Sequence, residues 1–439
     1  MGKENQEKSM KTGSSLSRRK FLKTTGAAAA LTAASPLLFS KHTFAAANRT
    51  IKVGFVSPKT GPLAAFAEAD DFVLGEIRKL LANGLTINGT THPVQIIEKD
   101  SRSDPNRAGQ VASELIKSDN VDILATSNTP ETVSPVSDQA EINSVPCVTT
   151  DAPWNAVYFG RGGTLTKGFD WTYHFFWGDQ DIKDVYVDIW SSVPTNKKIG
   201  ALWENDADGQ DWSNRNSGFP PLLQERGFTL IDPGLLDPRT GDFSSQIALF
   251  KREQVDIITG VLVPPAFATF WSQAAQQGLK AKIITIAKAI LFPAAVNALG
   301  DRSAGLSCEL WWSPNHPFKS SLTGHTAGAY CAAFETALKK QWTPPLGFKH
   351  ALMEVVIDSL KRTRDINSPA AIRDAIRSTN LDTIVGRVQW TGDPVKNVCR
   401  TPLVGGQWVR GKKYEYEIVV VNDDRAKMIP LQARLKLMS

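Results

Sequence analysis

The chain has 439 residues, of which 42% are hydrophobic and 21% charged, and these proportions exclude a mostly disordered chain and a protein with many membrane spans. The formal net charge of +6 belongs entirely to residues 1–47, which hold eight lysines or arginines and two acidic residues, whereas the rest of the chain holds 42 residues of each sign. A neutral main body gives no electrostatic basis for binding nucleic acid, so no nucleic-acid partner is predicted.

The first 47 residues have the three-part order of an export signal. A basic stretch contains Arg18 and Arg19, an apolar stretch covers residues 26–39, and three alanines stand at 45–47. The apolar stretch is shorter than the ~20 residues that a membrane-spanning helix needs. The pattern therefore predicts a twin-arginine signal peptide over residues 1–47, whose cleavage leaves a soluble periplasmic protein that does not span the membrane.

The segment after the signal alternates short apolar runs with stretches of helical periodicity. Strands are predicted at 51–56, 93–98, 121–125 and 146–149, and helices at 64–81, 106–117 and 131–143. Asn88-Gly89 predicts a two-residue hairpin turn. This order is typical of a parallel sheet with helices on both faces.

The same alternation starts again near residue 198. Strands are predicted at 198–203, 228–231, 255–258 and 282–286, with helices at 244–252 and 266–277. The last third mixes strands at 305–312, 385–390, 398–404 and 414–421 with helices at 324–340, 349–361 and 369–378. We therefore predict an α/β protein of two Rossmann-like lobes, each a parallel sheet flanked by helices, joined by a multi-strand hinge; ligands of such sheets bind at the carboxyl ends of the strands.

Sequence motifs of enzymes and metal sites are absent. The four cysteines (Cys147, Cys308, Cys331, Cys399) form no C-x-x-C pair, and whether two of them form a disulfide stays open. Residues 204–209 resemble the first half of a calcium-binding loop, but the twelfth position holds an arginine where a bidentate glutamate is needed. No metal, no cofactor and no catalytic residue is predicted, and a polar loop facing the cleft is the simpler interpretation of 204–209.

With these features in order, the chain resembles the periplasmic solute-binding proteins of ABC transporters, specifically the branched-chain amino-acid binding family with the type I periplasmic fold. The similarity is carried by the opening strand and loop at 51–62, the D-x-x-x-D-P segment at 100–105, the helix and strand at 127–150, and the helix end at 274–280. The resemblance implies that lobe 1 comprises 48–176 and 310–404, and that lobe 2 comprises 177–309 and 405–439.

The resemblance also implies a ligand site between the lobes. An aromatic residue of the first loop covers the ligand side chain in the family, and Phe66 stands there. Hydroxyl and amide donors at a helix N-terminus hold the ligand carboxylate, although ordinary helix capping would explain the same residues. The expected ligand-binding residues are Phe66, Ser127, Asn128, Thr129, Thr132, Thr150, Asp151, Trp154, Trp203, Asp208, Val263 and Lys288.

The sequence departs from the family at the partner of the ligand's ammonium group. Lys288 falls at or next to the position of a carboxylate, and a lysine would hold a carboxylate rather than an ammonium. Asp151 or Asp208 would supply an acidic partner from elsewhere. Trp154, Trp203 and the pair at 311–312 favour a ligand with an apolar or aromatic body.

The expected function is therefore capture of a small carboxylate-bearing solute by hinged lobe closure and its delivery to the permease of an ABC importer. Amino acids and aromatic or other organic acids both remain as solute classes. A ligand sensor that docks on a membrane receptor and a secreted enzyme on the same fold are the two alternatives.

Overall fold

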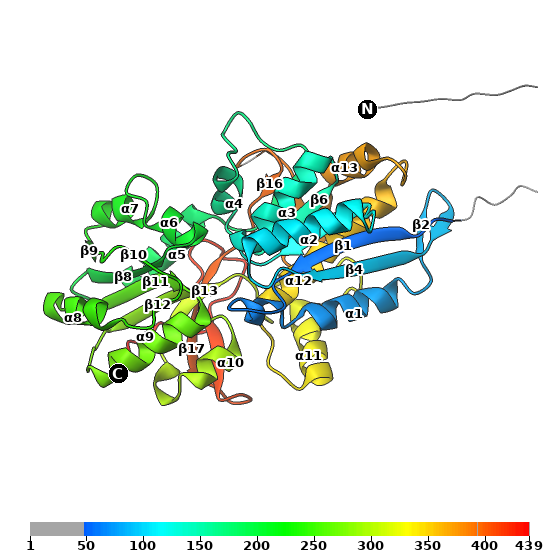
Figure 1. Cartoon of the computed structure of the whole chain (residues 1–439). Helices are drawn as coiled ribbons and strands as arrows, with labels where there is room; N and C mark the ends of the chain where they lie inside the picture. Colours follow the sequence, from blue (N-terminus) through cyan, green and yellow to red (C-terminus); the bar gives the residue numbers. More distant parts are fainter. Residues whose placement is uncertain (1–47, 393, 439) are drawn as a thin grey trace, which may run out of the picture. The chain divides into compact units, whose positions relative to one another are not determined.

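The structure is a computed structural model that describes residues 48–392 and 394–438, so the predicted signal peptide at 1–47 lies outside the described residues (Figure 1). Two large sheets dominate the described chain. The first sheet has six strands in the order β16-β7-β6-β5-β1-β4, and every neighbouring pair is parallel. Its strands are β1 (Ile51–Ser57), β4 (Val94–Asp100), β5 (Ile123–Ser127), β6 (Cys147–Thr150), β7 (Thr172–Phe175) and β16 (Val398–Cys399).

Helices cover both faces of the first sheet. Helices α2 (Pro105–Lys117) and α3 (Pro130–Asn143) pack on one face, and α1 (Asp70–Leu80) and α12 (Pro345–Arg362) lie on the other (Figure 1). Successive side chains of a strand point to opposite faces, which explains why β1 is apolar almost throughout.

The second sheet has eight strands, in the order β10-β8-β11-β12-β13-β17-β18 with β9 beside β8. The strands from β8 to β13 are parallel neighbours, whereas β17 and β18 run antiparallel at one edge. Its strands are β8 (Lys198–Glu204), β9 (Thr229–Ile231), β10 (Leu235–Leu236), β11 (Ile257–Leu262), β12 (Ile283–Lys288), β13 (Ser307–Leu310), β17 (Val404–Arg410) and β18 (Tyr416–Asn422). Its helices are α5 (Asp179–Ser191), α6 (Ala207–Trp212), α7 (Phe219–Glu225), α8 (Ser244–Glu253), α9 (Pro264–Gln276) and α10 (Pro293–Ala298).

The last third of the chain contributes to both sheets. It adds α12 and β16 to the first sheet and β17 and β18 to the second. Its remaining elements are α11 (Ala327–Leu338), α13 (Pro369–Arg377) and the hairpin of β14 (Asn380–Thr383) and β15 (Gly386–Gln389). The predicted α/β fold with two helix-flanked parallel sheets is confirmed, and the antiparallel strands β17 and β18 are an addition to it.

Local details agree with the sequence in some places and differ in others. Asn88 and Gly89 both have positive φ, 49° and 80°, and turn the hairpin of β2 (Leu85–Ile87) and β3 (Thr90–His92) as predicted. The helix expected at 64–81 is split into a 3₁₀ turn, Ala64–Ala67, and α1. All four cysteines are buried free thiols. None of the described helices is both long and apolar enough to cross a bilayer.

Candidate functional site

A small cavity of about 30 Å³ lies where strands of both sheets end. Loops that follow β5, β6, β7 and β13 reach it, together with the last residues of β12, as expected for ligand sites of parallel sheets. Its walls combine several aromatic rings with a few polar groups, which is the usual composition of a small-molecule site. The lining residues are Phe66, Thr129, Pro130, Asp151, Pro153, Phe176, Trp177, Asp208, Trp212, Val261, Ala287, Lys288, Glu309 and Trp311.

Five of the twelve predicted residues line this cavity: Phe66, Thr129, Asp151, Asp208 and Lys288. The other seven do not line it, because their side chains bond within the protein or belong to its core. They are Ser127, Asn128, Thr132, Thr150, Trp154, Trp203 and Val263.

The loop after β5 is held in a strained shape at the cavity wall. Asn128 and Thr129 have φ values of 71° and 62°, a region that is costly for a β-branched residue such as threonine. Thr129 stands at the N-terminus of α3, yet its hydroxyl makes no capping bond and has no hydrogen-bond partner among the described residues. The capping explanation therefore does not apply to Thr129, whose hydroxyl is free for a ligand.

The neighbouring polar residues of this loop serve a buried network. Lys349 of α12 forms an ion pair with Asp70 of α1, and its Nζ donates to Ser127 Oγ at 3.1 Å and to the Asn128 side-chain oxygen. Asn128 Nδ2 in turn donates to Asp151 Oδ2 at 3.1 Å. Ser127 and Asn128 thus fix the loop and Asp151, and are not open to a ligand.

Thr132, Thr150 and Val263 are likewise engaged within the protein. The hydroxyl of Thr132 bonds to that of Ser101 at 3.0 Å, and Thr150 Oγ1 donates to a backbone carbonyl of β7 at 2.6 Å. The Val263 amide donates to Glu204 Oε2 at 3.1 Å as α9 begins. These residues support the strand ends without reaching the cavity.

Asp151 follows β6 with φ of 57° and is only 3% exposed. Its Oδ2 accepts the bond from Asn128, while Oδ1 has no hydrogen-bond partner within the described chain. Burial raises the pKa of Asp151 to about 8, although the positive charge of Lys349 opposes this rise. Asp151 therefore lines the cavity with one carboxyl oxygen committed to Asn128 and the other without a partner in the described chain.

Aromatic side chains form much of the remaining wall. Trp177, Trp212 and Trp311 line the cavity, and the indole N–H of each lacks a hydrogen-bond partner among the residues described. Buried polar groups are normally paired, so three unpaired indole donors around one cavity indicate a place for ligand acceptors. The sequence suggested tryptophan at 311; Trp177 was missed, although its place two residues after β7 is a detectable signal.

Trp154 and Trp203 lie elsewhere. Trp203 is fully buried and stacks on Phe219 at 5.6 Å between ring centroids. Trp154 packs against Tyr158 at 6.4 Å in a small separate cluster. Both have the packing role that tryptophan most often has in a core.

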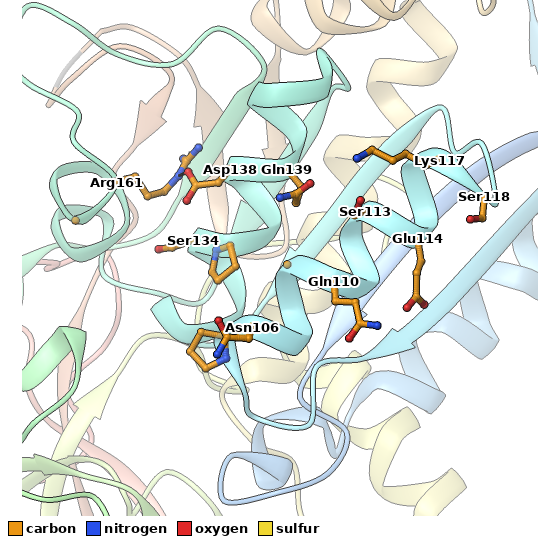
Figure 2. Close-up of a pocket in the computed structure, with 14 residues that line it drawn as sticks. Asn106, Gln110, Ser113, Glu114, Lys117, Ser118, Ser134, Asp138, Gln139 and Arg161 are labelled. Carbon is orange, nitrogen blue, oxygen red and sulfur yellow. Dashed lines mark hydrogen bonds and ion pairs between the residues drawn. The ribbon is translucent and has the colours of Figure 1, made fainter.

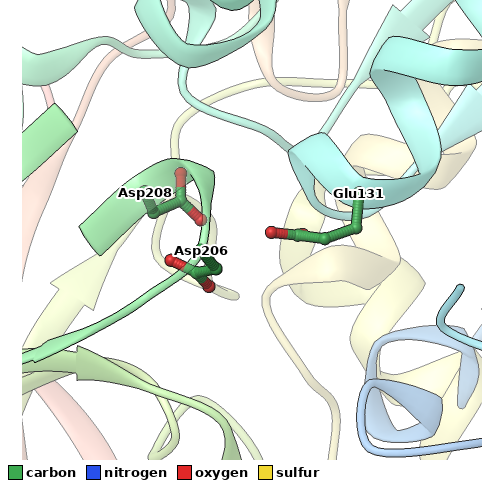
Figure 3. A group of neighbouring side chains, drawn as sticks. All are labelled: Glu131, Asp206 and Asp208. Atoms are coloured by element: carbon green, nitrogen blue, oxygen red, sulfur yellow. The ribbon is translucent and has the colours of Figure 1, made fainter. Parts of the chain in front are cut away.

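Lys288, which the sequence predicted to bind the carboxylate of the ligand, instead contacts acidic side chains of the protein itself. Lys288 Nζ lies 2.7 Å from Asp206 Oδ2, 2.5 Å from Asp208 Oδ2 and 3.8 Å from Glu131 Oε1. Figure 3 shows that Asp206 and Asp208 belong to one segment and that Glu131 approaches from a helix of the first sheet. Burial lowers the pKa of Lys288, but the three carboxylates outweigh this effect and raise it well above its ordinary value.

The carboxylates of Glu131, Asp206 and Asp208 surround the ammonium of Lys288. The oxygen atoms of Glu131, Asp206 and Asp208 are close enough to hold a metal ion, but the ammonium of Lys288 is already the cation among them. Lys288 is therefore neutralised inside the protein, and the expectation that it clamps a ligand carboxylate has no support in this geometry. Burial raises the pKa of Asp208 to about 8, with Lys288 opposing the rise.

Glu309 is a further acidic residue that lines the cavity, and it was not predicted from the sequence. It lies on β13, accepts a hydrogen bond from Tyr186 at 2.6 Å and contacts the Lys288 backbone amide at 3.3 Å. Burial raises its pKa to about 7, and that of Glu204 to about 7 as well. No local sequence pattern distinguishes Glu309 from a surface residue.

A larger groove lies away from this cavity, between α2 and α3 (Figure 2). Its lining is polar and open, and Arg161 at one end already pairs with Asp138 at 2.7 Å. An open groove lined by such side chains lacks the enclosed apolar surface of a small-molecule site. The cavity between the strand ends is therefore the candidate site.

Comparison with known proteins agrees with this architecture. The sequence model of the periplasmic binding protein family matches residues 50–412. The chain is similar in structure to the leucine-binding protein LivK of Thermotoga maritima, with 18% identity, a TM-score of 0.68, and coverage of 85% of this chain and 99% of that one.

Two further solved structures have comparable similarity. LivJ of Streptococcus pneumoniae in complex with isoleucine shows 18% identity and a TM-score of 0.67, covering 84% of this chain and 99% of that one. A solute-binding protein of R. palustris in complex with 4-hydroxybenzoate shows 16% identity and a TM-score of 0.69, covering 84% and 95%. No curated protein sequence matches the chain. From its family match and its fold, the chain belongs to the periplasmic binding protein family, with the type I fold.

Proposed function

We propose that this protein is the periplasmic solute-binding component of an ABC-type importer, and that it captures a small carboxylate-bearing solute, an amino acid or an aromatic or other organic acid, for delivery to a membrane permease. The observation that carries the proposal is the cavity at the strand ends, whose walls come from both sheets and hold polar groups without partners. The relatives of similar fold that hold isoleucine and 4-hydroxybenzoate support a ligand of this size and class.

Neutral donors suit the carboxylate of such a solute. Thr129, Trp177 and Trp311 line the cavity, and the Thr129 hydroxyl and the two indole N–H groups have no partners in the described chain. A carboxylate offers two acceptor oxygens, so it would satisfy donors whose burial is otherwise unfavourable. The aromatic rings would cover the body of the solute.

We propose that binding closes the two lobes over the solute without changing it chemically. In this proposal 48–176 and 310–404 form lobe 1, and 177–309 and 405–439 form lobe 2. The strands of the two sheets support this division, except that Leu310 of β13 and Val404 of β17 each fall one residue across a boundary. Phe66 of the first loop already packs against Phe292, which precedes α10 of the second sheet, at 4.8 Å between ring centroids. A solute that touches both walls favours the closed form, because only that form provides all its contacts.

Export by the twin-arginine route to the periplasm is part of the proposal. It rests on the order of charges and apolar residues in 1–47, which lies outside the described residues. Lysine substitution of both Arg18 and Arg19 should leave the precursor in the cytoplasm, as cell fractionation would show.

The binding proposal is tested by thermal unfolding and titration calorimetry with a panel of amino acids and aromatic acids. We expect at least one carboxylate to raise the melting temperature, and Trp311→Phe to weaken its binding about fivefold or more, because a smaller aromatic ring stays in place while the N–H donor is lost. Trp203→Phe is the matched control: it removes an equally unpartnered indole N–H outside the cavity and should leave affinity unchanged. Equal losses in both variants would contradict the assignment of the site.

A further inference from the structure

A second cavity, of about 280 Å³, lies beside α11 and shares no lining residue with the cavity at the strand ends. This α11 cavity is bounded by one face of α11, by Gln341 and Trp342 between α11 and α12, and by residues of the hairpin that joins β17 to β18. Its volume is close to the lower end of the range of small-molecule sites, about 300–1,000 Å³. It therefore has room for one small ring compound.

The two walls of the α11 cavity are attached to different sheets. Helix α11 packs on α1 of the first sheet, where Phe72 lies 5.6 Å from Tyr330 and 5.3 Å from Phe334 between ring centroids. The hairpin belongs to the second sheet, and Lys413 in its loop forms an ion pair with Glu335 of α11 at 2.5 Å. A compound held between α11 and the hairpin would therefore contact elements of both sheets.

Small side chains on α11 leave the space open. Gly328, Cys331 and Ala332 share the helix face that lines the cavity, because residues three and four apart are neighbours on a helix surface. Cys331 is a free thiol, and burial raises its pKa above the ordinary value. This part of the wall is therefore uncharged at neutral pH.

Two deeply buried polar side chains line the cavity without partners. Gln341 is 8% exposed and Trp342 is 9% exposed, and neither side chain makes a hydrogen bond within the described chain. Asn315 at the rim also has an unbonded side-chain amide there, and Gln432 uses only Oε1, which accepts from the Val420 amide at 3.0 Å. Buried polar groups are normally paired, so these amide and indole groups indicate a ligand that both donates and accepts hydrogen bonds.

The charged groups of the α11 cavity are committed to the protein. Lys413 is the one basic residue among the described residues that line it, and it is paired with Glu335. Oε1 of Glu417 accepts the backbone amides of Lys413 at 3.0 Å and of Tyr414 at 3.3 Å. An anionic compound would face two carboxylates without a free cation, and a cationic compound would compete with Lys413 for Glu335. The arrangement therefore favours an uncharged ligand.

Apolar surface completes the α11 cavity. Trp342 and Tyr414 contribute aromatic rings, and Ile418 and Val419 contribute aliphatic side chains. A sugar ring has hydroxyl groups around its edge, which donate and accept hydrogen bonds, and C–H groups on its faces, which pack on aromatic rings. We propose that the α11 cavity binds a small, uncharged, hydroxyl-rich ring compound of the monosaccharide class, as a second ligand that is chemically distinct from the carboxylate-bearing solute.

The test measures binding of D-glucose, D-galactose and D-mannose by saturation-transfer NMR and titration calorimetry. We expect at least one of these sugars to bind with a Kd of about 1 mM or tighter. The uronate and the 2-amino-2-deoxy derivative of the same sugar should bind about fivefold more weakly or worse, because the cavity has no free group to balance their charge.

Three variants locate the bound sugar. Ala332→Phe fills the cavity from an exposed position of α11 and should weaken sugar binding about tenfold or more. Ala337→Phe is the matched control, because Ala337 is also exposed on α11 but does not line the cavity, and its affinity for the sugar should be unchanged. Gln341→Leu removes the amide at similar side-chain size and should weaken binding about fivefold or more. Melting curves report whether each variant is folded.

Several outcomes would overturn the inference. Failure of all three neutral sugars to bind refutes it, and so does sugar binding that survives Ala332→Phe or Gln341→Leu, or that is lost equally in Ala337→Phe, because the sugar then lies elsewhere. A uronate or amino sugar that binds as tightly as the neutral sugar refutes the assignment of an uncharged ligand. Carboxylate binding at the strand ends is measured separately with Trp311→Phe, so either proposal can fail without the other.

Discussion

Replacing Lys288 by methionine distinguishes a lysine that holds the protein together from one that binds the solute. Methionine retains most of the side-chain length and removes the ammonium, which leaves the carboxylates of Asp206, Asp208 and Glu131 crowded together. Breaking a buried ion pair in this way costs about 3–5 kcal/mol. With an unfolding entropy of about 2.1 cal/mol/K per residue over roughly 390 residues, the melting temperature should fall by about 4–6 °C.

The pH dependence of this loss supplies a second check. The pKa of Asp208 is already raised to about 8 in the folded protein, so between about pH 4 and 8 the folded state binds more protons than the unfolded state. The contribution of Asp208 to the free energy of unfolding therefore falls as pH rises through that window. Without Lys288 the carboxylates repel one another unless they are protonated. The loss of stability caused by Lys288→Met should therefore be smaller at pH 5 than at pH 8.

Differential scanning calorimetry of the two proteins at both pH values measures these shifts. Lys280→Met is the control, because Lys280 is exposed and its loss should change the free energy of unfolding by less than about 0.5 kcal/mol. The reasoning is refuted if Lys288→Met melts like the unaltered protein and instead loses carboxylate binding, since Lys288 would then be the ligand clamp that the sequence suggested.

Two other predictions concern the buried charges. Asp70→Asn should lower the free energy of unfolding by about 3–5 kcal/mol, because it leaves the buried Lys349 without its ion-pair partner. The control Asp71→Asn should lower it by under about 1 kcal/mol, because the side chain of Asp71 is 83% exposed. Urea unfolding compares the two variants, and similar losses would contradict a stabilising role for the ion pair of Asp70 and Lys349. Between pH 7 and pH 8 the unliganded protein should lose stability as pH rises, because burial raises the pKa values of Asp151 and Asp208 to about 8. Three of the buried histidines, His174, His316 and His350, oppose this loss only weakly: their lowered pKa values keep them neutral in the folded state, and the unfolded chain binds few protons at histidine above pH 7. A melting temperature that is flat or rising over this range would argue against the two carboxyl groups being buried.

Patterns of short range in the sequence were sufficient to predict the elements and the strand ends. The apolar run of β1, the helical periodicity of α2 and the Asn88-Gly89 turn depend on neighbouring residues, and the structure confirms each of them. Thr129 and Asp151 were placed near the ligand because they follow predicted strands, and both line the cavity. A residue that follows a parallel strand is brought to the ligand edge whatever the details of packing.

Contacts between distant segments decided the rest. Trp203 and Trp311 both stand at the end of a strand, yet one stacks in the core and the other lines the cavity, and only the packing of the sheets separates them. From the sequence, Lys288 is interpreted as a free cation, but in the folded chain it pairs with Asp206 and Asp208, which lie 80 residues or more away in the sequence. Side-chain partners of this kind depend on three-dimensional proximity, which periodicity along the chain does not encode, and so the charge that the cavity offers a solute emerged only with the tertiary structure.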